Sequence, residues 1–156
     1  MTTHSVTHAT FVLERTYPVA PPRVFKAWAN PELKRKWLVG DAEPATEYSL
    51  DFRVGGTETI RGSMPDAGAY SYDALIQDIV PDLRIVYTYD MHIGGPRISV
   101  SVTTVEFTPS SDGTRLVLTE QGAYLDGLDT PQQREHGTGE LLEALAGVLQ
   151  AQGAAA

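Results

Sequence analysis

The chain has 156 residues, 42% of them hydrophobic, which suffices for one buried core and so for a single domain. Its 20 acidic and 12 basic residues leave a net charge of -8, which repels phosphate backbones and anionic membranes. We therefore expect neither nucleic acid nor a membrane as a partner. The chain has no cysteine and its histidines are isolated, so we expect no disulfide, no thiolate nucleophile, no metal and no cofactor.

Both ends of the chain are expected to be flexible tails. Residues 1–9 are polar and without a period, and residues 153–156 have no reason to pack. The N-terminus lacks the basic start and apolar run of a secretory peptide, and no stretch approaches the ~18 apolar residues of a membrane span. We therefore expect a soluble, cytoplasmic protein whose single domain covers residues 10–152.

The domain is expected to begin with a strand and two short helices. Residues 10–17 alternate between apolar and polar in the manner of a strand. Residues 20–30 begin with a proline pair that suits the first turn of a helix, and Trp28 lies on its apolar face. Pro31 ends this helix and begins a second one, with Trp37 inward. We expect the two helices to form an angled pair with both tryptophans in the core.

From Thr46 onward the hydrophobic period changes to two, which is typical of strands. Six such stretches follow one another, separated by glycine and proline turn signals: TEYSLDFRV, TETIRGSM, YSYDALIQDIV, RIVYTYD, RISVSVTTVEFTP and TRLVLTEQ. In the fifth stretch Val100 and Val102 share one phase and Val105 and Phe107 the opposite one. This change of phase predicts a bulge near residues 103–104.

Residues 130–150 are expected to form a long helix with a firm start. Thr130, Pro131 and Gln133 are typical of an N-cap, a first helical position and the end of a capping box. Apolar residues then recur with helical spacing and predict one buried face: Leu141, Leu142, Leu145, Val148 and Leu149. The order of elements predicts an α+β fold, a curved antiparallel sheet of about seven strands with the helices on one side.

The buried face of this helix is nearly bare in its first half, where it carries Arg134, Gly137 and Thr138. A glycine inside a helix costs ~1 kcal/mol relative to alanine, so Gly137 and Gly139 require a physical reason. One reason is a hollow between helix and sheet that holds a small molecule. The other is close packing against a strand, with Gly137 touching backbone. The sequence leaves both interpretations open.

Two charged side chains are candidates for contacts in such a hollow. Arg134 would either hold a carboxylate or enolate oxygen of a ligand or reach an acidic neighbour, and the second interpretation is favoured. Glu120 shares a strand face with Leu116 and Leu118. It is either a buried carboxylate with a raised pKa or a residue in water at a strand end, and the second is again favoured.

Aromatic and apolar residues complete the expected ligand-binding set. Tyr72 and Tyr87 would place hydroxyls in the hollow, although most tyrosines in such strands pack with one wet end. Trp28 is expected in the core, with a place at the cavity mouth as the alternative, and Leu141 lies on the helix face. No serine lies in a Gly-x-Ser-x-Gly elbow and RVGGTE is a hairpin without a following helix, so the sequence identifies no catalytic residue.

Five stretches carry a resemblance to a known family: VFKAWANPELKRKWLVG, DFRVGGTETI, SMPDAGAYSY, IQDIVPDLRIVYTY and GTRLVLTEQG. In this order and spacing they resemble the homologues of the activator of heat-shock protein 90 ATPase, a family of the SRPBCC (START-like) superfamily. The resemblance covers nearly all of residues 10–150. Its most specific parts are Trp28 with Pro31, Trp37, and the Arg-Val-Gly-Gly of residues 53–56.

The resemblance implies the helix-grip fold, in which a seven-stranded antiparallel sheet wraps around a long C-terminal helix and leaves a cavity between them. The last helix of the family usually carries Gly-Trp followed by two spaced leucines. Here Gly137, Leu142 and Leu145 match, but Thr138 replaces the tryptophan. The loss of an indole should enlarge the hollow by on the order of one aromatic side chain, unless neighbours fill it.

Three functions are compatible with these observations. The first is binding of a small hydrophobic or amphipathic molecule in the cavity. The second is an enzyme of the cyclase, aromatase or hydrolase kind found among START-like proteins, although no constellation in the sequence demands it. The third and least favoured is a co-chaperone, because the eukaryotic proteins that name the family carry a second domain. Dimerisation is common among relatives, and a homodimer is left open because the sequence has no seam that specifies one.

Overall fold

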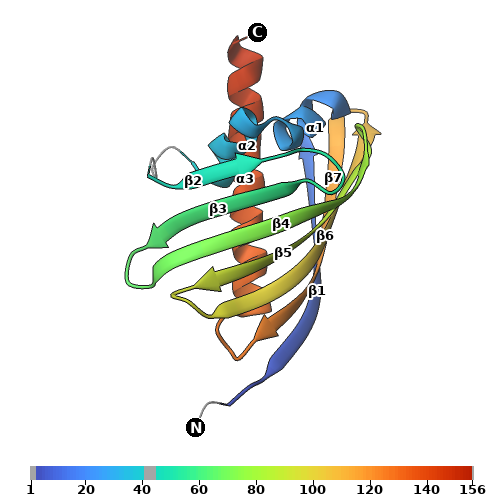
Figure 1. Cartoon of the computed structure of the whole chain (residues 1–156). Coiled ribbons are helices and arrows are strands. Elements are labelled where there is room, and N and C mark those ends of the chain that lie inside the picture. Colours follow the sequence, from blue (N-terminus) through green and yellow to red (C-terminus); the bar gives the residue numbers. More distant parts are fainter. Residues whose placement is uncertain (1–2, 41–44, 156) are drawn as a thin grey trace.

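The computed structural model describes residues 3–40 and 45–155, which form a curved antiparallel sheet wrapped around a long helix (Figure 1). The elements in chain order are β1 (Val6–Tyr17), α1 (Pro21–Ala29), α2 (Pro31–Leu38), β2 (Glu47–Leu50), β3 (Thr57–Met64), β4 (Gly68–Val80), β5 (Arg84–Ile93), β6 (Arg97–Ser110), β7 (Gly113–Leu125) and α3 (Pro131–Ala155). This is the α+β, helix-grip arrangement that the sequence predicted, with both short helices after the first strand.

The sheet has the strand order β1-β7-β6-β5-β4-β3-β2, and every pair is antiparallel. Consecutive strands from β2 to β7 are therefore neighbours, and β1 is the edge strand beside β7. Residues 6–9, which were expected in the N-terminal tail, belong to β1 and pair with residues 122–125. At the other end α3 continues to Ala155, so the helix also extends into the expected C-terminal tail.

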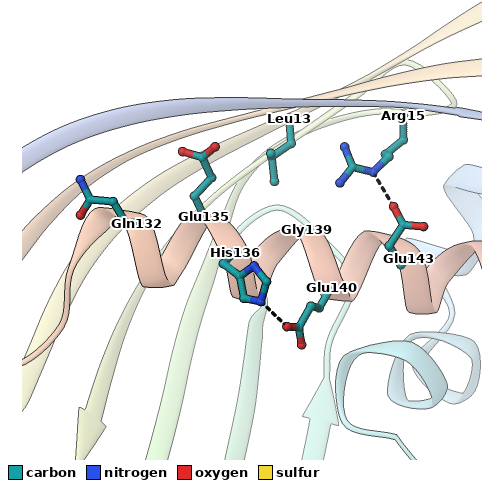
Figure 2. A pocket seen from close by; sticks show the side chains of 8 residues that line it. All are labelled: Leu13, Arg15, Gln132, Glu135, His136, Gly139, Glu140 and Glu143. Carbon is teal, nitrogen blue, oxygen red and sulfur yellow. Dashed lines mark hydrogen bonds and ion pairs between the residues drawn. The ribbon is translucent and has the colours of Figure 1, made fainter.

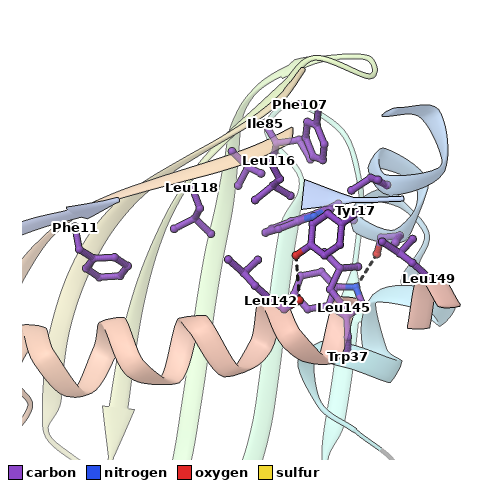
Figure 3. Packing of buried hydrophobic residues seen from close by; sticks show 14 residues of the cluster. Phe11, Tyr17, Trp37, Ile85, Phe107, Leu116, Leu118, Leu142, Leu145 and Leu149 are labelled. Carbon is purple, nitrogen blue, oxygen red and sulfur yellow. Dashed lines mark hydrogen bonds between the residues drawn. The ribbon is translucent and has the colours of Figure 1, made fainter. Parts of the chain in front are cut away.

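The main core lies between α1, α2, the C-terminal half of α3 and the part of the sheet formed by β5, β6, β7 and β1 (Figure 3). Leu142 and Leu145 of α3 are fully buried there, and burying a leucine side chain contributes about 1.5–3 kcal/mol. Trp28 and Trp37 contact each other with ring centroids 4.8 Å apart, so both are core residues, as predicted. The Tyr17 hydroxyl donates to the Leu142 carbonyl at 3.0 Å and ties α3 to β1.

Strand β6 does not have the predicted bulge. Its register runs without a shift through residues 103–104 against both β5 and β7. The irregularity lies at the start of the strand, where Met91 pairs with Ser99 but His92 pairs with Arg97, so that Ile98 is the extra residue. The prediction of a bulge near residues 103–104 is therefore wrong.

The inward phase of β6 is polar in its first half, which explains the error. Ser99, Ser101 and Thr103 are buried, whereas Val100 and Val102 are exposed. In this half of the strand the apolar residues Val100 and Val102 therefore lie on the outer face of the sheet, and not on the inner face as their pattern suggested. Two of these buried hydroxyls bind charged residues: Ser99 accepts from Arg134 of α3, and Thr103 donates to Glu120 of β7.

The N-terminus of α3 is capped almost as expected. The Thr130 hydroxyl accepts from the Gln133 amide at 3.1 Å. The Asp129 carboxylate, and not the Gln133 side chain, accepts from the Thr130 amide at 2.7 Å.

In the part of the chain that the structure describes, no helix has the length and apolar character that crossing a bilayer requires.

Candidate ligand-binding site

Beside the main core, the concave face of the sheet is lined by tyrosines. A second buried cluster consists of Ile60, Tyr72, Ala74 and Tyr89, with Leu38, Val39, Tyr48, Tyr70, Tyr87 and Met91 packed against it. Register places Tyr48, Ile60, Tyr72 and Met91 in one row across β2, β3, β4 and β5. The rings of Tyr72 and Tyr89 lie 4.9 Å apart between their centroids. This face therefore combines apolar rings with hydroxyl groups, each of which needs a partner when buried.

Arg134 is buried where α3 begins to cross this face. It donates to the Tyr89 hydroxyl, the Ser99 hydroxyl and the Asp129 carboxylate, each at 2.8 Å. Its Nη1 also lies 3.8 Å from a carboxylate oxygen of Glu120, and the side chains of the two residues are 9% and 2% exposed. The favoured interpretation of Arg134, that it reaches acidic neighbours, is confirmed.

The expectation that Glu120 lies in water is wrong. Its carboxylate accepts from the Tyr89 hydroxyl at 2.8 Å and from the Thr103 hydroxyl at 2.9 Å. Burial raises the pKa of the Glu120 carboxyl, and the two hydrogen bonds and the charge of Arg134 oppose this rise only in part. The network joins β5, β6 and β7 to the start of α3, so it holds the helix on the sheet.

A second buried ion pair joins α2 to β3. Lys34 Nζ donates to Glu58 Oε1 at 2.9 Å, and the two residues are 5% and 2% exposed. Glu58 also accepts from the hydroxyls of Tyr48 at 2.6 Å and Tyr72 at 3.3 Å. Burial, followed by the charge of Glu58, raises the pKa of both tyrosines, so their hydroxyls remain protonated donors.

The sequence reasoning missed this pair, although two spacing signals point to it. Glu58 is two residues from Ile60 and so shares its inward strand phase. Lys34 is three residues before Trp37 and so shares its inward helix face. An acid and a base that both interrupt buried faces are candidates to pair with each other, because an isolated buried charge is costly.

A cavity of about 30 Å³ lies next to Lys34, between the tyrosine-lined face, α2 and α3. Its walls are formed by Trp28, Lys34, Trp37, Leu38, Tyr72, Tyr87, Leu118, Thr138, Leu141 and Leu142. A cavity of this volume has room for about one or two water molecules. Leu38, Thr138 and Leu141 are half-buried and belong to the part of the wall nearest the surface.

The structure brings most of the predicted ligand-binding residues to this cavity, namely Trp28, Tyr72, Tyr87, Thr138 and Leu141. Arg134 and Glu120 instead form the separate network beneath the start of α3. Gly137 is not on the inward face: it is exposed, and a Cβ added there would have nothing within 4 Å. Gly139 is buried, but the nearest atom to an added Cβ would be Nη2 at the end of the Arg15 side chain, at 3.3 Å, so no strand backbone approaches it closely.

A wider groove of about 490 Å³ lies between α3 and β1 (Figure 2). Two ion pairs lie along it: Arg15 with Glu143 at 2.8 Å, and His136 with Glu140 at 2.6 Å. These side chains remain accessible to solvent, so the groove does not enclose an apolar ligand in the way that binding sites usually do.

Across residues 3–40 and 45–155, no three histidine or acidic side chains gather to hold a metal ion.

A seven-stranded antiparallel sheet that grips a C-terminal helix defines the helix-grip, START-like class of proteins. The family described as "Activator of Hsp90 ATPase homolog 1-like protein" matches residues 18–150, and the chain belongs to this family. The family predicted from the sequence motifs is thereby confirmed. No curated protein is similar enough to match the chain.

Solved structures of related proteins have the same fold. An uncharacterised protein from Rhizobium leguminosarum is 44% identical, with a TM-score of 0.92 and with 96% of this chain and 99% of that chain covered. The Mll3558 protein from Rhizobium loti is 54% identical, with a TM-score of 0.86 over 92% of this chain and 99% of that chain. An AHSA1-like protein from Aeromonas hydrophila, 17% identical over 93% of this chain and 94% of that chain, shares the fold with a TM-score of 0.68.

Proposed function

We propose that the protein binds a small hydrophobic or amphipathic molecule between the sheet and α3, in the cavity beside Lys34. The observation that carries the proposal is the composition of the cavity wall. Aromatic and aliphatic side chains form most of it, and a few polar groups are placed among them, which is the usual composition of a small-molecule site. No comparable observation favours an enzyme or a co-chaperone.

Binding requires the cavity to widen, because its closed volume is below that of any ligand with several carbon atoms. Leu38, Thr138 and Leu141 are the wall residues best placed to move, since their half-buried side chains have fewer contacts to lose than fully buried ones. Thr138 occupies the position at which the family usually has tryptophan. The smaller side chain leaves this part of the wall free to open.

Thr138→Trp tests the proposal because it adds an indole to the cavity wall. We expect the affinity for the neutral apolar dye N-phenyl-1-naphthylamine to fall by about 5- to 150-fold, since crowding a packed site costs about 1–3 kcal/mol. Dye fluorescence measures the affinity, and circular dichroism establishes that the fold is intact.

Gly137→Trp is the matched control, since it adds the same side chain one residue away, where an added Cβ meets open space. This variant should bind the dye as the unmodified protein does. Equal dye binding by Thr138→Trp and Gly137→Trp would show that the cavity is not the binding site. Native mass spectrometry of the freshly purified protein would reveal the mass of a ligand retained from the cell.

A further inference from the structure

Lys34 has more hydrogen-bond donors at the cavity than its protein partners use. Its Nζ lies 5.1 Å, 5.9 Å and 5.5 Å from the ring centroids of Trp28, Trp37 and Tyr87, which all line the cavity. A lysine ammonium has three N–H donors. Among the described residues, Nζ makes one hydrogen bond, to Glu58. The other donors therefore face aromatic rings, which hold an ammonium less directionally than an oxygen acceptor does.

Trp28, which lines the cavity, carries a further buried donor, its indole N–H. Trp28 is 3% exposed, and its Nε1 is buried without an acceptor among the residues that the structure describes. In contrast, Nε1 of the neighbouring Trp37 donates to the Ala27 carbonyl at 2.9 Å. Almost all buried donors in proteins have an acceptor, so an exception beside a cavity requires an explanation.

The carboxylate partner of Lys34 is, by comparison, well supplied with donors. Glu58 accepts hydrogen bonds from Lys34, Tyr48 and Tyr72. Its negative charge also compensates the positive charge of Lys34, so the buried pair is neutral as a whole. A ligand carboxylate would bring a second negative charge next to Glu58 and would lose its own hydration, which is costly in a buried site. An uncharged oxygen can accept from the same donors without this penalty.

We propose that the cavity recognises an uncharged apolar molecule through one hydrogen-bond-accepting oxygen, such as a ketone or ester carbonyl. This oxygen accepts from Lys34 Nζ and Trp28 Nε1, while the apolar body of the molecule packs against the aromatic and leucine walls. The inference rests on the proposed function, because it names the chemical class of the ligand in the same cavity.

Three probes of matched size and shape test the inference: isopropylbenzene, acetophenone and benzoate. Binding is followed by ¹H–¹⁵N NMR, because the chain has two tryptophans and so two indole N–H signals, which Trp28→Phe assigns. Acetophenone should shift the Trp28 signal downfield and bind about fivefold more tightly than isopropylbenzene, since a net hydrogen bond contributes about 1 kcal/mol. Benzoate should bind more weakly than acetophenone.

Trp28→Phe removes the indole donor and should lower the preference for acetophenone over isopropylbenzene. Ser101→Ala is the matched control, because it removes a buried hydroxyl that also lacks a partner among the described residues but does not line the cavity. Its preference should equal that of the unmodified protein.

Equal affinities for acetophenone and isopropylbenzene would overturn the inference and leave the proposed function standing. Tighter binding of benzoate would also overturn it, because Lys34 would then serve as an anion site. Failure of all three probes to bind, together with N-phenyl-1-naphthylamine, would overturn both proposals.

Discussion

The two buried ion pairs have similar chemistry and different surroundings. The guanidinium of Arg134 hydrogen-bonds to Tyr89, Ser99 and Asp129 and lies close to the carboxylate of Glu120. These partners come from three strands and from the segment before α3. Lys34 has one hydrogen-bond partner among the described residues, and aromatic rings surround the rest of its ammonium. A guanidinium, with five donors in a rigid plane, suits a junction of several elements, whereas an ammonium is a compact charge with rotatable donors.

This difference separates a structural charge from a candidate binding charge. At the Arg134 network three N–H donors of the guanidinium have partners, Tyr89, Ser99 and Asp129, and these hydrogen bonds hold α3 against the sheet. At Lys34 the donors exceed the acceptors, and a cavity adjoins them. Burial of a charge does not by itself indicate function, but spare donors at a cavity do.

The strongest test of the comparison is removal of each base. Arg134→Met should lower the free energy of unfolding by about 3–5 kcal/mol, because it leaves Glu120 buried without its counter-charge. Urea denaturation followed by circular dichroism measures the change. Lys34→Met should also be destabilising, because it leaves Glu58 buried without its counter-charge. Of the two variants, only Lys34→Met should change the preference for acetophenone over isopropylbenzene. A loss below about 1 kcal/mol for Arg134→Met would contradict its role as an anchor.

A smaller effect is expected from removing single hydroxyls near the two carboxylates. Tyr48→Phe deletes the hydrogen bond to Glu58 and should cost about 1.5–3 kcal/mol, the range for hydrogen bonds to charged groups. Tyr124→Phe deletes a buried hydroxyl that has no partner among the described residues, so stability should stay the same or rise slightly. Thermal unfolding measures the stability of both variants and of the unmodified protein. Similar losses of stability in Tyr48→Phe and Tyr124→Phe would contradict the prediction.

The smallest effect concerns the pH dependence of stability at Glu120. Its pKa is raised above the ordinary 4.5, chiefly by burial, so the folded protein holds this proton more tightly than the unfolded chain does. The resulting stabilisation is present below pH 4.5 and is lost as the pH rises through the folded-state pKa. Glu120→Gln removes this titration. We therefore compare the unfolding free energies of the unmodified protein and of the variant at each pH. The difference, unmodified protein minus variant, should decrease as the pH rises from 4.5 towards neutrality. A difference that does not change with pH would contradict the raised pKa of Glu120.

The sequence predicted most of the fold because the local patterns agreed with one another. The two-residue period, the proline starts of α1 and α2 and the Thr130 cap each specified an element that the structure contains. The ends of the elements were less well predicted. Residues 6–9 lie in a stretch that showed no strand period, yet they form part of β1 because β7 offers them partners, from Gly122 to Leu125.

The candidate site was predicted only in part, because its polar residues interrupt the apolar pattern on which the predictions depended. Thr138, Tyr72 and Tyr87 were found, since the hollow was inferred from the missing side chains of the helix. Glu120 was placed in water because a carboxylate is normally exposed, and its partners Tyr89, Thr103 and Arg134 come from elements far away in the sequence. The same reason explains why Lys34 and Glu58 were missed.

By itself, the sequence determined the class of fold, the family and the position of the long helix, because periodicity, caps and turns act over a few residues. Only the tertiary structure decided which charges are buried, which serines face inward and which helix glycine is exposed. These outcomes depend on side chains that meet across strands and helices, as Lys34 of α2 meets Glu58 of β3. The chemistry of the cavity belongs to this second group, because elements from α1 to α3 build its wall.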